Sequence, residues 1–413
     1  MVSGPKIHRT DTFIHQNNFG VLKEVVMLLP GHYEFSCRVK TNSGNRALEN
    51  LSVEMDALNA GKPFVITDKE NSKKGLVDVL LHAFRDSGRT VGIFDAVPAV
   101  LELNLIRDMF KLHRDGGFDA MIAIGGGAVM DSAKVLNIAV SGEPEDLGRY
   151  TGEDRIKKSL NPLSYVPTLS GTGYETSRFA FLGDNRYASH RLMPDLAIID
   201  PRMTIPEDVR TIAGTSLIAL TQSVEAYIRP DRNPLIGSYA YTSIQFIMEN
   251  LVEVIKKSRD GSRRMALANA HCMAGYVFSN AEAGMAYTLG KSLSDACRIS
   301  HGLCMGIVLP HVLEWQASLN SEHIGDLLMP LAGFDIYAGT EEALRIPKAI
   351  ERIRNMQNEL FEASNGVIPR TLKDAGIPDK DVLKDVARQV GGNSKGFDAD
   401  GCLTVLEQAW GNK

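Results

Sequence analysis

The chain has 413 residues, 44% of them hydrophobic and 23% charged, and its formal net charge is −5 at pH 7. This length allows two domains with sizeable cores, and the composition is typical of a soluble globular protein such as a metabolic enzyme. The slight negative charge argues against a broad nucleic-acid-binding surface.

The cysteines and the apolar segments indicate the compartment. The five cysteines form no CxxC pair, which is typical of reduced thiols and suggests no zinc module. The first residues lack the apolar core of a signal peptide, and eighteen apolar residues nowhere run together without a charge. We therefore expect a cytoplasmic protein with no nucleic-acid or membrane partner.

The first half of the chain alternates strand and helix patterns. Residues 1–32 are a mixed N-terminal extension, and a strand-like pattern begins at Tyr33. Such alternation predicts a parallel sheet with right-handed crossovers. The predicted strands are Pro63–Thr67, Thr90–Phe94, Ala120–Ile124, Ser164–Val166 and Leu196–Ile199. The predicted helices are Arg46–Leu58, Lys74–Ser87, Val100–Arg114 and Asp131–Ser141.

Strand patterns stop after about residue 204, and the rest of the chain reads as helices joined by loops. These helices are Ala213–Tyr227, Tyr239–Lys257, Arg263–Ala283, Ala286–Ala296, Gly302–Ser318, Glu341–Ser364, Arg370–Ala375, Lys380–Val390 and Ala399–Trp410. We expect an α/β domain at 33–203 and an all-helical domain at 204–413. The cleft between the two is the expected active site.

Two glycine-rich turns, GGGAVMD and PTLSGTGYE, follow predicted strands. Ligands of parallel sheets bind beyond the carboxyl ends of the strands, and glycines let backbone N–H groups approach a pyrophosphate at a helix N-terminus. For either turn alone, the glycines could simply mark a turn. Together the two predict a nucleotide site. Its predicted residues are Asp95, Gly125, Gly126, Gly127, Ala128, Asp131, Thr168, Leu169, Ser170 and Thr172.

A third segment, GMAYTLGKSLSDACRISH at residues 284–301, carries polar groups in an otherwise small and apolar stretch. Tyr287 and Lys291 are four residues apart, so on a helix they lie on the same face. His301 closes the segment. We expect this face to carry the chemistry.

Taken together, these motifs resemble the iron-containing (group III) alcohol dehydrogenase family, which is similar in fold to dehydroquinate synthase. The resemblance runs from about residue 33 to the C-terminus and rests on GGGAVMDSAK, PTLSGTGYETSR, PDLAIIDP, TSLIALTQSVEAY and SHGLCMGIVLPHV. It implies a Rossmann-like domain that holds NAD(P) and a helical domain. It also implies hydride exchange with an alcohol or aldehyde, and a homodimer or larger homo-oligomer.

The sequence departs from the family at the metal site. The resemblance implies one divalent metal held by an aspartate and three histidines. These positions are here Ile218, Gln222, Tyr287 and His301, and Lys291 replaces a histidine that resembles a proton relay. Iron or zinc needs three or four N, S or carboxylate ligands, so we expect no catalytic metal.

Hydride reduction of a carbonyl leaves an alkoxide that some group must protonate. We predict that Tyr287 is this acid, that Lys291 lowers its phenol pKa from about 10 toward neutrality, and that His301 orients the substrate or relays a proton. The alternative is that these residues merely fill the lost metal site. Lys291 could instead pair with an anionic substrate.

The leading hypothesis is therefore a metal-independent, NAD(H)-dependent alcohol dehydrogenase or aldehyde reductase. NAD(H) is preferred over NADP(H) because the Asp95 carboxylate would accept from ribose hydroxyls and repel a 2′-phosphate. Two alternatives stay open. One is a lyase or cyclase that uses bound NAD, and the other is a catalytically silent NAD-binding partner or regulatory protein.

Overall fold

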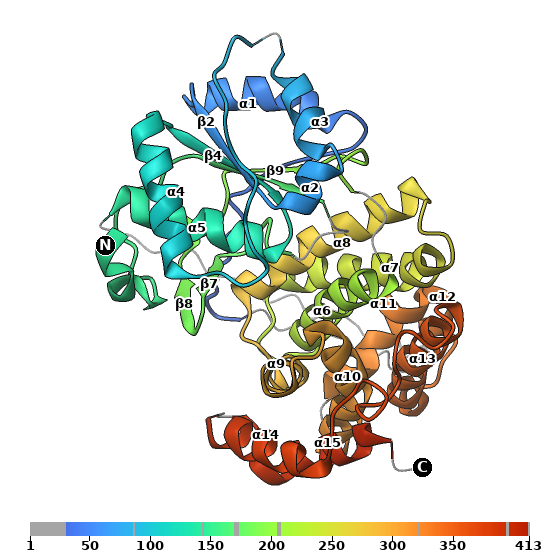
Figure 1. Cartoon of the computed structure of the whole chain (residues 1–413). Helices are drawn as coiled ribbons and strands as arrows, with labels where there is room; N and C mark the ends of the chain where they lie inside the picture. The colour runs from blue at the N-terminus through green and yellow to red at the C-terminus, as the bar shows by residue number, and fades with distance from the viewer. Residues whose placement is uncertain are drawn as a thin grey trace, which may run out of the picture.

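The computed structural model describes residues 30–85, 87–142, 144–168, 173–204, 208–319, 322–393 and 396–411. Residues 1–29 of the predicted N-terminal extension lie outside this set. Figure 1 shows a sheet with flanking helices in the upper half and a helical body below it, coloured yellow-green to red. The predicted fold class, an α/β domain followed by a helical region, is confirmed.

The upper half is built on a six-stranded parallel sheet in the order β1-β9-β6-β4-β2-β3. The strands are β1 (Lys40–Ser43), β2 (Pro63–Thr67), β3 (Gly92–Phe94), β4 (Ala120–Gly125), β6 (Leu163–Pro167) and β9 (Leu196–Ile199). All residues of β2, β4, β6 and β9 are buried, as expected when helices cover both faces of a parallel sheet. Such strands read as continuous apolar runs, and for this reason the predicted Pro63–Thr67 and Leu196–Ile199 match β2 and β9 residue for residue.

Helices pack on both faces of this sheet. The connecting helices are η1 (Ala47–Asn50), α1 (Leu51–Ala57), α2 (Lys69–Lys73), α3 (Leu76–Ala83), α4 (Leu103–Gly116), α5 (Gly127–Ser141), η2 (Pro144–Tyr150) and η3 (His190–Leu192). One apolar layer joins α1 and α3 to the sheet, and a second joins α4 and α5 to its other face. The predicted helix Lys74–Ser87 corresponds to α3, which is shorter. α3 begins only at Leu76, because the positive φ of 76° at Gly75 separates it from α2.

A small second sheet was not predicted. It consists of β5 (Gly152–Glu153), β7 (Phe179–Leu182) and β8 (Asn185–Ala188), in the order β5-β8-β7. β7 and β8 form an antiparallel hairpin that turns through Gly183, where φ is 56°. Figure 1 shows this hairpin at the lower edge of the α/β half, toward α9. It therefore brings side chains of the first half to the helical half.

In its described residues, the second half contains helices joined by turns and loops, and no strands. Its helices are α6 (Val209–Tyr227), α7 (Pro234–Lys256), α8 (Gly261–Asn280), α9 (Met285–Cys297), α10 (His301–Ser318), η4 (Glu322–Leu327), α11 (Leu328–Ala332), α12 (Phe334–Ala338), α13 (Glu342–Ala363), α14 (Lys380–Asn393) and α15 (Ala399–Trp410). The predicted helix Arg370–Ala375 is wrong, since the chain makes turns there. No helix in the described part of the chain is long and apolar enough to cross a membrane.

α8 ties the two halves together. Tyr276 donates to the Val39 carbonyl (2.7 Å), and Thr176 donates to the Cys272 carbonyl (2.6 Å). A Cβ on Gly275 would lie only 2.0 Å from the Gly173 carbonyl oxygen, so the backbones meet more closely than a side chain would permit. The helical half is thus fixed against the sheet at this helix.

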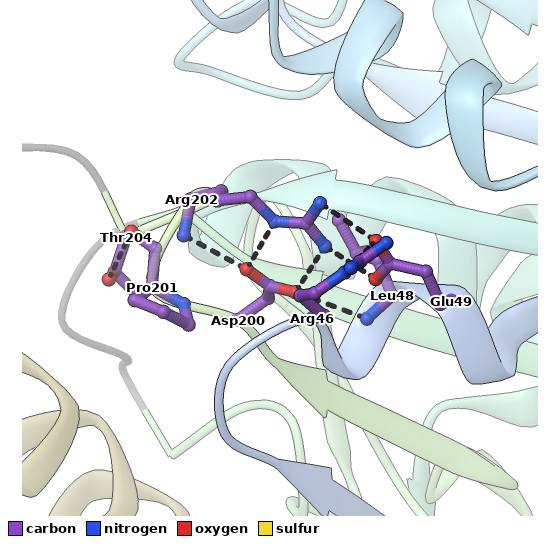
Figure 2. Close-up of polar contacts among 7 residues, drawn as sticks. All are labelled: Arg46, Leu48, Glu49, Asp200, Pro201, Arg202 and Thr204. Carbon is purple, nitrogen blue, oxygen red and sulfur yellow. Dashed lines mark hydrogen bonds and ion pairs between the residues drawn. The ribbon is translucent and has the colours of Figure 1, made fainter.

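A polar network holds the chain where the sheet ends. Figure 2 shows the Arg202 guanidinium bridging the buried Asp200 (Nε to Oδ1, 3.0 Å) and Glu49 on η1 (Nη1 to Oε1, 3.0 Å). The Asp200 carboxylate also accepts from the backbone N–H of Leu48 at 3.1 Å. Hydrogen bonding to Arg202 is the main cause that lowers the pKa of Glu49 to about 2. The Asp200 carboxylate after β9 therefore has a structural role. It binds η1 directly at Leu48 and, through Arg202, at Glu49.

Candidate active site

A cavity of about 620 Å³ opens at the carboxyl ends of the central strands. It is lined by residues 68–71, Lys74, 96–99, 126–129 and Thr168. Four predicted cofactor residues thus come together around one space, namely Gly126, Gly127, Ala128 and Thr168. This is the edge of a parallel sheet at which nucleotides bind.

The N-terminus of α5 opens into this cavity. Gly126 is its N-cap and supplies no side chain to satisfy the first N–H groups of the helix. These donors and the helix dipole favour a phosphate group. Gly125 permits the tight turn, since a Cβ there would lie 2.7 Å from Val129 Cγ2. The chain is therefore shaped to let a pyrophosphate approach backbone N–H groups.

Other predicted cofactor residues lie elsewhere. Asp131 is buried and accepts from the backbone N–H of Phe181 (3.1 Å), and burial raises the pKa of its carboxyl. Asp95 accepts from Ser72 Oγ (2.9 Å) and immediately precedes the lining residue Ala96. Neither carboxylate lines the cavity, so their contact with a cofactor stays a prediction. Leu169, Ser170 and Thr172 lie outside the described residues.

The cavity contains a carboxylate that sequence reasoning missed. Asp68 follows the last residue of β2 and lines the space directly. Its side chain accepts from the backbone N–H of Asn71 (2.9 Å) and from Asn71 Nδ2 (2.6 Å). The sequence did contain a signal for this residue. Asp68 directly follows the strand Pro63–Thr67, just as Asp95 directly follows the strand that ends at Phe94.

The positions at which the family resemblance implies metal ligands lie on α6, α9 and α10. Ile218 and Gln222 lie one turn apart on α6, and Tyr287 and His301 lie on α9 and α10. The Tyr287 and His301 rings are 5.4 Å apart between centroids at an interplanar angle of 70°. Gln222 and Tyr287 share a gap of only about 10 Å³.

These residues do not fit the divalent metal that the family resemblance implies. Isoleucine offers no ligand atom, and the amide and the phenol are poor substitutes for a carboxylate and an imidazole. Among the side chains that the structure describes, no three or more His, Cys, Asp or Glu lie close enough to hold an ion.

Tyr287 lies in a row of aromatic rings. Its ring centroid is 4.9 Å from that of Phe278, which in turn is 4.9 Å from Phe179 on β7. Burial is the main cause that raises the pKa of Tyr287 well above its usual value near 10, and the Arg186 guanidinium opposes this rise. The phenol therefore keeps its proton at neutral pH.

The predicted lowering of the Tyr287 pKa by Lys291 is wrong. Lys291 Nζ forms an ion pair with Asp295 Oδ2 at 2.7 Å, one turn along the same helix. The charge of Lys291 acts instead on His301, where burial and this ammonium lower the pKa to about 4. His301 is therefore neutral at pH 7. Its buried Nε2 has no hydrogen-bond partner among the described residues.

Glu225 is a second carboxylate of the site that the sequence motifs did not predict. Its carboxylate accepts from the backbone N–H groups of Ala286 (2.6 Å) and Tyr287 (3.3 Å), and so it caps α9 from α6. Gly284 leaves room for this contact, since a Cβ would lie 2.4 Å from the carboxylate carbon. Burial raises the pKa of Glu225 to about 7. A carboxylate three residues after Gln222 on an apolar helix was the available signal.

Comparison with known proteins agrees with this architecture. The family model "Iron-containing alcohol dehydrogenase" matches residues 39–201, and "Fe-containing alcohol dehydrogenase family, C-terminal" matches residues 212–408. Long-chain-alcohol dehydrogenase 1 of Geobacillus thermodenitrificans is 30% identical over 83% of this chain and 87% of its own length. The NAD-dependent methanol dehydrogenase of Bacillus methanolicus is 26% identical over 84% and 92%.

A solved structure of a 1,3-propanediol oxidoreductase superposes with a TM-score of 0.83 at 26% identity, and covers 92% of this chain and 100% of its own. The named relatives are alcohol dehydrogenases, which are oxidoreductases that act on CH–OH groups. The two models together span both halves of the fold. The chain therefore belongs to the iron-containing alcohol dehydrogenase family.

Proposed function

We propose that the protein reduces a small aldehyde to an alcohol with NADH, without a catalytic metal, and that Tyr287 supplies the proton. The observation that carries this proposal is the pairing of the Tyr287 and His301 rings, 5.4 Å apart, at positions where the family resemblance implies metal ligands. A phenol and a neutral imidazole can do by hydrogen bonding what the metal does as a Lewis acid.

The proton chemistry follows from the pKa directions. Hydride transfer to the carbonyl carbon leaves an alkoxide, which is a far stronger base than a phenolate and takes the proton of Tyr287 readily. The unpartnered Nε2 of His301 can accept a hydrogen bond from the product hydroxyl, or donate to the carbonyl in its other tautomer. Glu225 accepts from the backbone N–H of Tyr287 and so holds the start of α9, which carries the phenol, against α6.

The cofactor assignment rests on the cavity at the sheet edge. Its volume of about 620 Å³ and the open N-terminus of α5 support a dinucleotide. The Asp68 carboxylate supports NAD(H) over NADP(H), because it would accept from ribose hydroxyls and repel a 2′-phosphate. The relative from Bacillus methanolicus is named as NAD-dependent, in keeping with this choice.

The two reaction directions should differ in pH dependence. Reduction uses the protonated phenol, which predominates at all pH values below its raised pKa, so the rate should stay nearly flat from pH 6 to 9. Oxidation needs the phenolate, whose fraction rises about tenfold per pH unit below the pKa. Its rate should therefore climb through pH 9 without levelling. A plateau of the oxidation rate near pH 8 would show a lowered phenol pKa and contradict this proton assignment.

A catalytically silent NAD-binding protein is the second candidate. It is favoured by the tight ring packing of Phe278, Tyr287 and His301 and by the small gap beside Gln222. The reductase and the silent protein are distinguished by following NADH absorbance with a panel of short aldehydes. Loss of absorbance supports reduction, whereas tight NADH binding with no turnover of any aldehyde supports the silent protein.

A further inference from the structure

Two arginines share one carboxylate on the small sheet beside the aromatic row. Arg178 Nη1 lies 2.9 Å from Glu153 Oε2, and Arg186 Nη2 lies 2.8 Å from Glu153 Oε1. Both guanidinium carbons stack over the ring of Phe179, at 4.9 Å and 4.7 Å from its centroid. We name Glu153, Arg178 and Arg186 the arginine cluster. Two cations and one anion leave it with a net positive charge.

The aromatic row connects this cluster to Tyr287. Phe179 lies under both guanidiniums and contacts Phe278, which contacts Tyr287 in turn. In support, the Arg186 guanidinium is the nearby charge that most opposes the rise of the Tyr287 pKa. A small molecule at the Tyr287 hydroxyl could therefore extend along the rings and reach the arginines with its far end.

The cluster retains unused donor capacity. Arg178 Nε is buried and has no hydrogen-bond partner in the described part of the chain. A guanidinium carries five N–H donors in a planar fork that matches the oxygens of an oxoanion. The side chains of Arg186 and Glu153 are 44% and 50% exposed, so a ligand can reach them from solvent.

The other cations near Tyr287 are less suited to an anion. Lys291 is neutralised by Asp295 on its own helix. Arg298, two turns beyond Lys291, is the exposed residue that ends α9 in a left-handed conformation, with φ of 56°. Of these cations, Arg186 of the arginine cluster is the one whose charge acts on Tyr287.

We propose that Arg178 and Arg186 bind an anionic group at the far end of the substrate, so that the aldehyde reduced at Tyr287 is a short one with a carboxylate, phosphonate or sulfonate. This substrate class rests on the proposed reduction. Glu153 holds the two guanidiniums side by side, and the oxoanion takes the donors that Glu153 leaves open. The aromatic row contacts the carbon chain between the two polar ends.

A pair of isosteric probes tests this without turnover. Butanoate and butanamide are titrated calorimetrically into the NAD⁺-saturated protein. We expect butanoate to bind at least about tenfold more tightly, and this preference to shrink as salt is raised. Equal affinities, or no binding of butanoate, would overturn the anion site. Wild-type protein suffices for this comparison, so it does not depend on whether a variant folds.

Variants assign the preference to the cluster. Arg178→Met and Arg186→Met should each bring the butanoate preference close to unity. The matched control is Arg107→Met, because Arg107 on α4 pairs with Glu145 at 3.2 Å with 38% of its side chain exposed. It should keep the full preference. If Arg107→Met loses as much as Arg186→Met, the effect is general electrostatics and the assignment is wrong.

Turnover separates this inference from the proposed function. NADH oxidation is followed with 4-oxobutanoate and with butanal, which differ in the terminal carboxylate. Reduction of both with equal kcat/KM would reject the anionic substrate class and leave the reductase proposal standing. A butanoate preference with no reduction of any aldehyde would reject the reductase proposal and leave the anion site standing.

Discussion

Tyr287→Phe should lower kcat for aldehyde reduction by at least about 10²-fold, the usual contribution of a positioned general acid. The substitution removes one hydroxyl and keeps the ring that packs between Phe278 and His301. The Michaelis constant for NADH should stay unchanged, because the cofactor cavity is lined by other residues. Steady-state kinetics with thermal unfolding as a folding check would measure this.

Two variants control for this result. Tyr241→Phe removes a hydroxyl from α7, beside Tyr227 in a separate groove, and should keep the rate within about twofold. Lys291→Met should cost less than Tyr287→Phe, because its ammonium pairs with Asp295 and does not lower the phenol pKa. A near-normal rate in Tyr287→Phe would mean that the ring only fills the lost metal site.

Asp68→Ser should shift cofactor preference from NADH toward NADPH. Like charges about 4 Å apart repel by a few kcal/mol at the effective dielectric of a protein surface, so the ratio of the two kcat/KM values should change on the order of 10²-fold. Serine is also a good N-cap and should preserve the start of α2. The measurement is the kcat/KM for each cofactor with one aldehyde.

Asp95→Ser is the matched control for the cofactor prediction. Asp95 hydrogen bonds to Ser72 and does not line the cavity, so its loss should change the cofactor ratio little. A large change in Asp95→Ser together with none in Asp68→Ser would place the ribose at Asp95. The assignment drawn from the sequence would then be the correct one.

Much of the fold was predictable because parallel strands are buried on both faces. β2 and β9 are continuous apolar runs bounded by turn residues, and both were located to the residue. The β7–β8 hairpin was not predicted, because β8 begins with exposed, polar Asn185 and Arg186 and so is not a continuous apolar run. In the small sheet β8 pairs with both β5 and β7, and local sequence does not reveal this pairing.

Part of the candidate site was predictable from the family resemblance. Tyr287 and His301 were placed together by motif alignment, and their rings are in contact. Helical spacing placed Tyr287 and Lys291 on one face. The same spacing puts Asp295 four residues after Lys291, and this ion pair was not predicted. The rise in the Tyr287 pKa was not predictable, because it is caused by burial, which depends on the tertiary fold.

Tyr287 and His301 are proposed to act without a metal, and treatment with a chelator is the most direct test of this proposal. The protein is treated with a strong chelator, its iron and zinc are measured by mass spectrometry, and NADH-dependent aldehyde reduction is assayed before and after. We predict an unchanged rate with only trace metal in the protein, because Ile218 and Gln222 cannot complete a ligand set. Loss of activity on chelation, restored by Fe²⁺ or Zn²⁺, would show that the reaction needs a metal.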